Sequence, residues 1–195
     1  MKHANIKVVG APQIGVLTTY ESKLPERIIK LAEELGKELA KKGCIVITGG
    51  NGGLMRVVSK AVVEYGGLVV GVLSDELAKV GEEHPLYNPY MTVKIRTGMN
   101  YDARSVIIVE SSDALIVLAG GAGTLTEVCM AYNRRKPIVV IEGSGLIADR
   151  IKEKFPNGYI DHRKKTKILF AKNPKEAVEL ALTALKQQCN LKANH

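Results

Sequence analysis

Short runs of apolar residues, many of them β-branched, recur along the chain between segments rich in glycine, proline or charge. A continuous apolar run of about four to six residues is typical of a strand that is buried on both faces of a parallel sheet. The pattern predicts seven such strands, at residues 6–9, 44–48, 68–73, 91–95, 114–118, 138–141 and 167–170.

The segments between these runs show helical spacing of their apolar positions. One set is Ile28, Leu31, Leu35 and Leu39, and further sets occupy residues 54–65 and 125–132. Asn173-Pro174, followed by Glu176, predicts the start of a last helix. Residues 106–109 fit a short helix or a strand, and residues 75–89 are expected to be irregular.

Strands that alternate with helices predict parallel pairing, with helices on both faces of the sheet. The expected fold class is therefore α/β: a Rossmann-like, doubly wound parallel sheet of about seven strands in a three-layer arrangement. One such nucleotide-binding domain is expected to span residues 1–195. Ligands of these sheets bind beyond the carboxyl ends of the strands, so the turns there are the candidate site.

Composition narrows the class of protein. A chain of 195 residues fits one domain, and no apolar run approaches the roughly 20 residues of a membrane span. Without an apolar leader at its start, the protein is expected to be cytoplasmic. The three cysteines show no CxxC spacing, which favours buried free thiols over disulfides or zinc. The histidines form no metal-ligand or Ser-His-Asp pattern, so no metal and no nucleophile are expected.

The net charge of +8 is concentrated near the end of the chain, where residues 149–195 carry 11 basic and 5 acidic side chains. No aromatic residues interleave with these charges to stack on bases, so a solvated basic face is favoured over a nucleic-acid groove. DNA-processing proteins with related Rossmann cores are a third class that would fit the positive charge, although this charge lies in the wrong part of the chain.

Three glycine turns are candidate ligand contacts. The first contains Gly10 and leads into a polar stretch up to Ser22. It is not GxGxxG, and the chain contains no GxxxxGK[ST], which argues against a standard dinucleotide cofactor and a triphosphate hydrolase. Thr18, Tyr20 and Lys60 are polar candidates near turn ends, although solvation explains them equally well.

The second turn, which begins after Thr48, runs from a predicted strand directly into a helix, and four of the five residues at 49–53 are glycine. Such a backbone can approach a ligand closely, and the free amides of the helix start can bind an anion. A tight turn with close helix packing is the alternative, although one or two glycines would be enough for it. The candidate contacts are Gly49, Gly50, Gly52, Gly53, Leu54 and Met55.

The third turn repeats the arrangement of strand, glycines and helix. Its candidate phosphate contacts are Gly120, Gly121, Gly123 and Thr124, and Glu127 follows one helical turn later. Thr124 and Glu127 also have the spacing of a capping box, in which both side chains would satisfy amides of the helix start. The alternative is a carboxylate placed beside the sugar of a phosphate-bearing ligand.

The two motifs resemble those of the "lonely guy" (LOG) family. Residues 49–55 are similar to its GGGxxGLM turn and residues 120–127 to its PGGxGTxxE signature, and the match covers about residues 5–142. The resemblance implies a Rossmann-like homodimer that cleaves nucleoside 5′-monophosphates to a free base and ribose 5-phosphate. It also implies that Arg104 and Glu127 are the catalytic pair, because residues 99–104 are similar to the segment that supplies the family's arginine.

The chain departs from the family pattern at three points. Ala119 stands in place of the proline that opens the signature, Arg56 replaces a glycine, and the segment around Arg104 differs from the family's HERK sequence. These features are similar to a branch that includes molybdenum-cofactor carrier proteins. Two functions therefore stay open: a phosphoribohydrolase, or a non-catalytic carrier or sensor of a phosphorylated pterin or nucleotide. No cofactor is expected to be required, and AMP-like nucleotides and molybdopterin are the candidate ligands.

Overall fold

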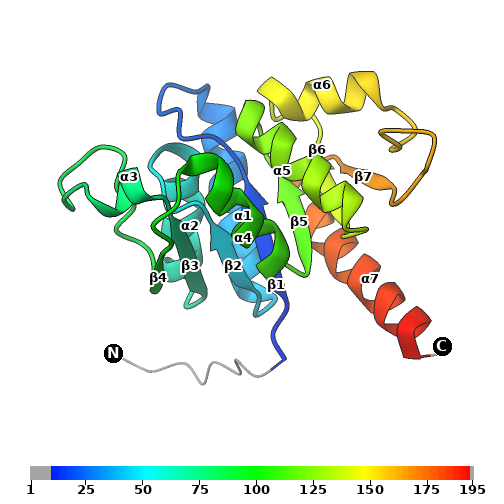
Figure 1. The fold of residues 1–195 in the computed structure, drawn as a ribbon, viewed down its shortest axis with the longest axis horizontal. Helices are drawn as coiled ribbons and strands as arrows, with labels where there is room; N and C mark the ends of the chain where they lie inside the picture. Colours follow the sequence, from blue (N-terminus) through cyan, green and yellow to red (C-terminus); the bar gives the residue numbers. More distant parts are fainter. Residues whose placement is uncertain (1–9, 194–195) are drawn as a thin grey trace.

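The computed structural model of the protein describes residues 10–193, which form one seven-stranded parallel sheet with helices on both faces (Figure 1). The strands are β1 (Gln13–Leu17), β2 (Ile45–Thr48), β3 (Leu68–Leu73), β4 (Val93–Arg96), β5 (Ala114–Val117), β6 (Ile138–Ile141) and β7 (Ile168–Ala171). The helices are α1 (Glu26–Lys41), α2 (Gly53–Glu64), α3 (Asp75–Ala78), α4 (Tyr101–Ser111), α5 (Ala122–Asn133), α6 (Leu146–Lys154) and α7 (Pro174–Ala193).

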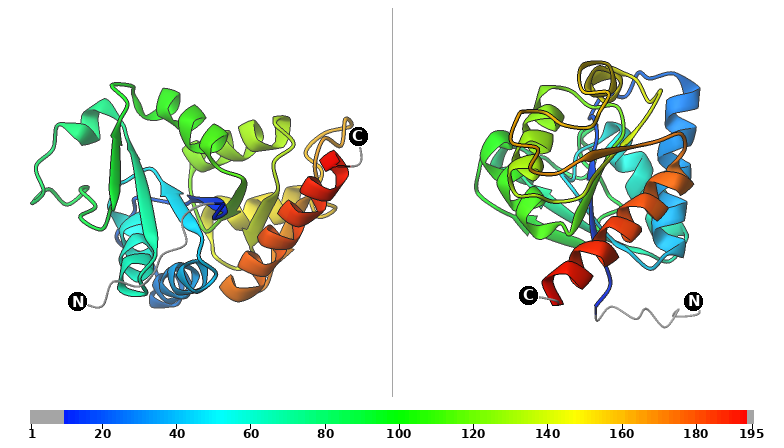
Figure 2. Two further views of the ribbon diagram at one scale, coloured as in Figure 1. Left: turned by 90° about the horizontal axis from the view of Figure 1, so that it is seen from below. Right: turned by 90° about the vertical axis from the view of Figure 1, so that its right-hand side faces the viewer.

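The strand order is β4-β3-β2-β1-β5-β6-β7, and every neighbouring pair is parallel. Helices α1, α2 and α7 pack on one face of the sheet, and α4 and α5 pack on the other (Figure 2). Helix α6 adds Ala148 and Ile151 to the apolar cluster of the second face. Each layer buries its own apolar cluster against alternate residues of the strands, for example Val16 on one face and Leu17 on the other. The predicted three-layer α/β class is therefore confirmed.

The first strand differs from the sequence prediction. Residues 6–9, the predicted strand, lie outside the described residues, and β1 occupies Gln13–Leu17, which belongs to a polar stretch in the sequence prediction. Gly15 interrupts the apolar run of β1 and obscures its pattern. A side chain at Gly15 would collide with Ser112, so close packing of α4 on the sheet explains this glycine.

The other predicted strands are confirmed within one or two residues at each end. Residues 106–109 belong to helix α4, and the segment 75–89 contains the short helix α3. The predicted start of α7 is confirmed, because Asn173 Oδ1 accepts a hydrogen bond from Glu176 N and Glu176 Oε2 accepts one from Lys172 N. Helix α6 was not predicted.

The position of β1 in the sheet determines where a ligand can bind. From β1 the chain continues to β2 on one side, while β5 pairs with β1 on the other side. The connections that leave the carboxyl ends of β1 and β5 therefore diverge and open a crevice between them. This is the topological switch point at which doubly wound sheets bind ligands.

The described residues include no helix that is long and apolar enough to cross a membrane. All three cysteines are free. Cys44 is buried, which raises the pKa of its thiol to about 11. Cys129 is half-buried and Cys189, on the last helix, is exposed, so the expectation of buried thiols was wrong at these two positions.

Candidate functional site

A cavity of about 470 Å³ lies at the switch point, a size that suits a small-molecule ligand. Three parts of the chain form most of it: the segment after β1, the first turns of α4, and the turn from β5 into α5. The lining residues discussed below are Thr18, Tyr20, Glu21, Asn51, Tyr101, Asp102, Arg104, Ser105, Gly121, Gly123, Thr124, Glu127 and Leu146.

The amino end of α5 offers free backbone amides to the cavity. The first hydrogen bond of this helix runs from Leu125 N to Gly121 O at 3.0 Å, so the amides of residues 122–124 precede the helical ladder. No protein atom lies within 4 Å of the space that a side chain would fill at Gly121 or Gly123. Free amides, open space and the positive end of the helix dipole together favour an anion here.

The turn before α5 is held in place by the start of α6. Ile147 N donates to Gly120 O at 3.0 Å, and Ala148 N donates to Ala119 O at 3.2 Å. Ala119 has a φ of 58° and its amide donates to Ser144 Oγ at 2.9 Å. A proline can adopt neither this φ nor this hydrogen bond. The departure from the family signature at Ala119 therefore corresponds to a turn that a proline could not form.

Arg104 is a buried cation of the cavity, with a residue exposure of 5%. Asn100 starts helix α4 by accepting a hydrogen bond from Ala103 N, and this places Arg104 on the first turn that faces the sheet. Its Nη1 donates to Val72 O at 2.7 Å, and the guanidinium lies 5.6 Å from the ring centre of Tyr101. Burial lowers the pKa of Arg104, and the nearby carboxylate of Glu127 opposes that shift.

Glu127 is a buried acid of the same cavity, with a residue exposure of 8%. Its Oε1 accepts a hydrogen bond from Ser105 Oγ at 2.9 Å. Burial raises the pKa of Glu127, while Ser105 and Arg104 lower it. Within residues 10–193, Arg104 and Glu127 form no direct ion pair. Both groups therefore interact through space while each keeps capacity for a ligand.

The capping-box alternative for Thr124 and Glu127 was wrong. Helix α5 begins at Ala122 with Gly121 as its N-cap, so Thr124 is already the third helical residue. Thr124 Oγ1 donates to Thr18 O, at 3.3 Å, and bridges two segments that line the cavity. Glu127 lies beyond the first turn, where no free amide is within its reach. Its burial in the cavity consequently has no explanation as a helix cap.

The glycines of the second turn pack mostly against protein. A side chain added at Gly50 would collide with the side chains of Leu73 and Met91. One added at Gly52 would collide with Pro85 O, and one at Gly53 with the backbone of Tyr20. Gly49 faces the guanidinium of Arg104. Gly50 and Gly53 also have positive φ angles of 69° and 57°. Leu54 is buried in the apolar core. Of the predicted contacts in this turn, Met55 lines the cavity, and Asn51 joins it.

Polar atoms without a protein partner gather in this cavity. In residues 10–193, four buried side-chain atoms have no hydrogen-bond partner, and three of them, Thr18 Oγ1, Asn51 Oδ1 and Arg104 Nε, belong to residues of this cavity. Buried polar atoms are rarely left without a partner, because each one costs free energy. A polar ligand would supply the partners that the protein lacks.

Several sequence candidates lie elsewhere. Gly10 precedes the amino end of β1 and is not part of the cavity lining, because the turn that follows this strand begins at Thr18. Lys60 forms an ion pair with Glu64 on α2. Ser105 and Leu146 were missed, and nothing in their local sequence distinguishes them. Asn51 was missed too, although it is the one side chain among four glycines and could have been found on that ground.

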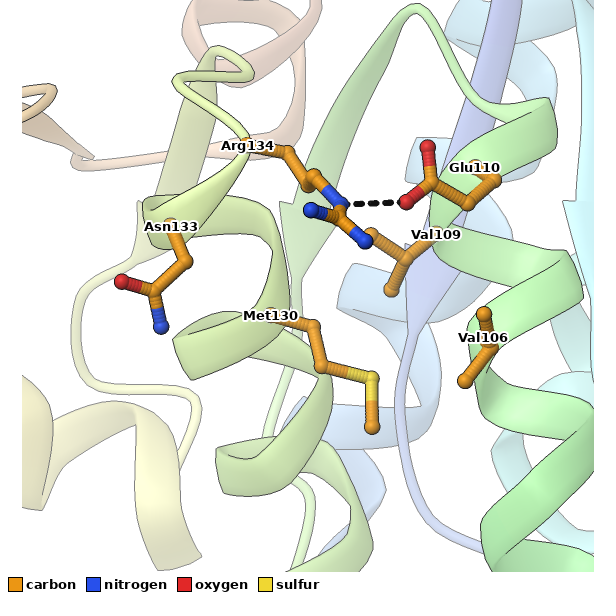
Figure 3. A pocket seen from close by; sticks show the side chains of 6 residues that line it. All are labelled: Val106, Val109, Glu110, Met130, Asn133 and Arg134. Atoms are coloured by element: carbon orange, nitrogen blue, oxygen red, sulfur yellow. Dashed lines mark hydrogen bonds and ion pairs between the residues drawn. The ribbon is translucent and has the colours of Figure 1, made fainter.

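A second hollow, of about 350 Å³, lies between α4 and α5 on the outer surface (Figure 3). An ion pair between Arg134 and Glu110 crosses it, above the side chains of Val106, Val109 and Met130. Because apolar side chains and one satisfied ion pair form most of the lining of this hollow, the switch-point cavity is the better candidate for a polar ligand.

The described residues contain no group of three or more His, Cys, Asp or Glu side chains that could hold a metal ion.

Several known proteins are similar to this chain in sequence or in structure. An uncharacterised protein of Archaeoglobus fulgidus is 39% identical over 137 residues, which are 67% of this chain and 84% of that protein. A probable cytokinin riboside 5′-monophosphate phosphoribohydrolase of rice, LOGL9, is 40% identical over 98 residues. These residues are 50% of this chain, and the chain spans only 41% of the rice protein.

Two solved structures match almost along their whole length. The crystal structure of TM1055, a structural-genomics target, has a TM-score of 0.79 at 32% identity and covers 88% of this chain and 99% of its own. The molybdenum cofactor binding protein of Rippkaea orientalis has a TM-score of 0.72 at 26% identity, and the match covers 90% of this chain and 98% of that protein. The model of the SLOG cluster4 family matches residues 11–178. The chain therefore belongs to the SLOG cluster4 family of LOG-like Rossmann proteins.

Proposed function

We propose that this protein binds a nucleoside 5′-monophosphate and hydrolyses its N-glycosidic bond, which gives a free base and ribose 5-phosphate. The observation that carries the proposal is the burial of Arg104 and Glu127 in one cavity, unpaired with each other, beside the free amides of α5. The rice relative, whose name describes such a reaction, supports it.

The ligand's phosphate is assigned to the turn at residues 120–124, because free amides and the helix dipole favour an anion there. Glu127 lies about one and a half helical turns further along α5, a separation that suits the distance from a phosphate to its ribose. Arg104 then orients the ribose or holds the phosphate with the guanidinium nitrogens that Val72 O does not occupy.

The proposed chemistry depends on the charge that develops on the ribose. As the bond to the base breaks, the base nitrogen keeps the electron pair and positive charge grows on the sugar. The Glu127 carboxylate stabilises this charge or accepts a proton from the attacking water. In a buried site such an interaction is stronger than in water, so a buried carboxylate suits this step better than an exposed one.

The direct test is to incubate the protein with adenosine, guanosine, cytidine and uridine 5′-monophosphates and to measure released base and ribose 5-phosphate. Glu127→Gln should keep nucleotide binding, measured by calorimetry, while base release falls by about 10²-fold or more. Glu64→Gln is the matched control, because Glu64 lies on the surface of α2 outside the cavity. Binding of a monophosphate by the wild type without release of any base would contradict the hydrolase.

A second function, a carrier or sensor of a phosphorylated pterin, is favoured by one observation. The match to the Rippkaea orientalis molybdenum cofactor binding protein covers 98% of that chain, whereas the rice enzyme is covered to 41%. The same amides and the same unpartnered polar atoms would then hold a molybdopterin phosphate without turnover. Binding of molybdopterin together with no base release from any monophosphate would support this function over the first.

A further inference from the structure

Ser105 is a buried side chain of the cavity that the proposed chemistry does not use. It follows Arg104 on α4 and is 6% exposed. Its Oγ lies 2.9 Å from Glu127 Oε1 and 3.2 Å from the carbonyl oxygen of Tyr101, four residues earlier in the same helix. The helical geometry thus holds the Ser105 hydroxyl at one fixed place, against one oxygen of the carboxyl group.

The two oxygens of Glu127 have different surroundings. Among residues 10–193, Ser105 is the only hydrogen-bond partner of the Glu127 side chain, and it contacts Oε1. No side-chain hydrogen bond or ion pair within the described residues reaches the second oxygen, Oε2. Since Glu127 lines the cavity, the hydrogen bond from Ser105 fixes one oxygen and leaves the other one free for a ligand.

We infer that Ser105 is a positioning residue for the proposed hydrolysis: its hydroxyl orients the Glu127 carboxyl so that Oε2 faces the ribose and the attacking water. The inference rests on the proposed function for its chemistry, and on the Ser105–Glu127 hydrogen bond for its geometry. The same short helix would supply both the arginine of the site and the group that orients its glutamate.

The hydrogen bond also affects the charge state of Glu127. Ser105 lowers the pKa of the carboxyl, against the effect of burial, and Arg104 on α4 acts in the same direction. The other charged groups that line the cavity are Asp102 on α4 and Glu21 after β1, both exposed. Loss of the Ser105 hydroxyl should therefore raise the pKa of Glu127, because burial would then be opposed by Arg104 alone.

The test combines Ser105→Ala with a direct titration of Glu127. Carbon-13 labelling of glutamate side chains, with Glu127→Gln to assign the signal, gives the pKa of Glu127 by NMR. Ser105→Ala should raise it by about 1 to 2 pH units, the usual scale for a hydrogen bond to a charged group. The acidic limb of the pH profile for base release from nucleoside monophosphates should move upward by the same amount.

Two further variants separate orientation from packing. Ser105→Thr keeps a hydroxyl and should keep the wild-type pKa of Glu127. Ser105→Cys fills the site with a somewhat larger group that is only a weak donor, so its pKa for Glu127 should fall between those of Ser and Ala. Ser112→Ala is the matched control, since Ser112 makes a similar bond to Ile108 O on the same helix, away from Glu127.

A loss of rate without a change in the pKa of Glu127, in Ser105→Ala or Ser105→Cys, would overturn the positioning role. The titration tests the Ser105–Glu127 hydrogen bond, and base release by the wild type tests the proposed hydrolysis. If the wild type releases no base, the proposed hydrolysis is contradicted, while the titration still shows whether Ser105 holds the carboxyl of Glu127.

Discussion

The guanidinium group of Arg104 packs against the Cα of Gly49, so closely that no space remains for a methyl group between them. Gly49 follows β2 and Arg104 lies on α4, so this contact joins the two layers at the back of the cavity. The glycine is required by the arginine rather than by an unusual backbone angle, because its φ is not in the left-handed region.

Gly49→Ala should therefore displace Arg104 and lower base release at least tenfold, with a loss of stability of about 1–3 kcal/mol from overpacking. Thermal unfolding and turnover of nucleoside monophosphates measure the two effects. Gly81→Ala is the control, because no atom lies within 4 Å of the added carbon. Wild-type turnover in Gly49→Ala would show that the position of Arg104 does not matter.

Gly123→Asp should separate helix stability from anion binding. An acidic residue in the first turn of α5 stabilises the helix by about 0.3–1 kcal/mol. The same carboxylate would occupy the open space beside the amides and repel a phosphate, so phosphate affinity should fall tenfold or more. Gly123→Asn is the uncharged control. Calorimetric titration of the wild type and the two variants with phosphate measures the change in affinity. A crystal structure of the wild type with phosphate bound away from residues 120–124 would contradict the prediction.

The stability of the protein should depend on the ionisation of Glu127. Burial raises the pKa of Glu127 in the folded state above the ordinary value near 4.5. At pH values between these two pKa values, the folded protein therefore holds a proton that the unfolded chain has released. Stability from this group is therefore lost as the pH rises from about 4.5 through the raised pKa. Glu127→Gln lacks this loss.

Urea unfolding of both proteins at several pH values measures the effect. The free energy of unfolding of Glu127→Gln, relative to the wild type, should increase across that interval and then stay constant. Contributions of carboxyls with lowered pKa, such as Asp161, cancel in the difference. A difference that is independent of pH would show that Glu127 ionises normally in the folded protein.

We propose that the protein is a homo-oligomer, most simply a twofold dimer, as the family resemblance implies. The hollow between α4 and α5 is the surface to test, because Val106 on its rim is 44% exposed. Val106→Lys should lower the mass measured by light scattering. Val93→Lys on the edge strand β4, where the valine is 50% exposed, should leave it unchanged. A wild-type monomer at micromolar concentration would exclude the dimer.

Much of the fold could be predicted from the sequence because buried parallel strands are continuous apolar runs. Strand β6 is fully buried and was predicted with its exact ends. Strand β1 was missed since Gly15, needed for contact with Ser112, lowers the strand signal, and that contact is invisible in the local sequence. Helix α6 was missed because its start depends on Gly145, with a φ of 86°, and on hydrogen bonds to the distant Ala119 and Gly120.

The site was predictable in part. The turn at 120–124 lies in the cavity, as expected of glycines that precede a helix at the end of a parallel strand, and its binding of an anion stays a prediction. Arg104 was identified through the family resemblance, as periodicity gives no signal for a buried cation. Ser105 could not be predicted, because its role depends on the packing of α4 against α5. At 49–53 the packing of protein groups around Gly50, Gly52 and Gly53 accounts for these glycines, and a ligand contact through their backbone stays a prediction.

The turn at Ala119 has a consequence for how this family can vary. Its amide needs Ser144 Oγ as an acceptor, and that hydroxyl also donates to Ile141 O. A relative with proline at the position of Ala119 has no amide there, so a hydroxyl at the position of Ser144 would keep only its hydrogen bond to the carbonyl oxygen at the position of Ile141. The two positions, 25 residues apart, should therefore be coupled during evolution in one direction: a residue with a free amide at position 119 needs the hydroxyl as its acceptor, whereas proline there relaxes that need.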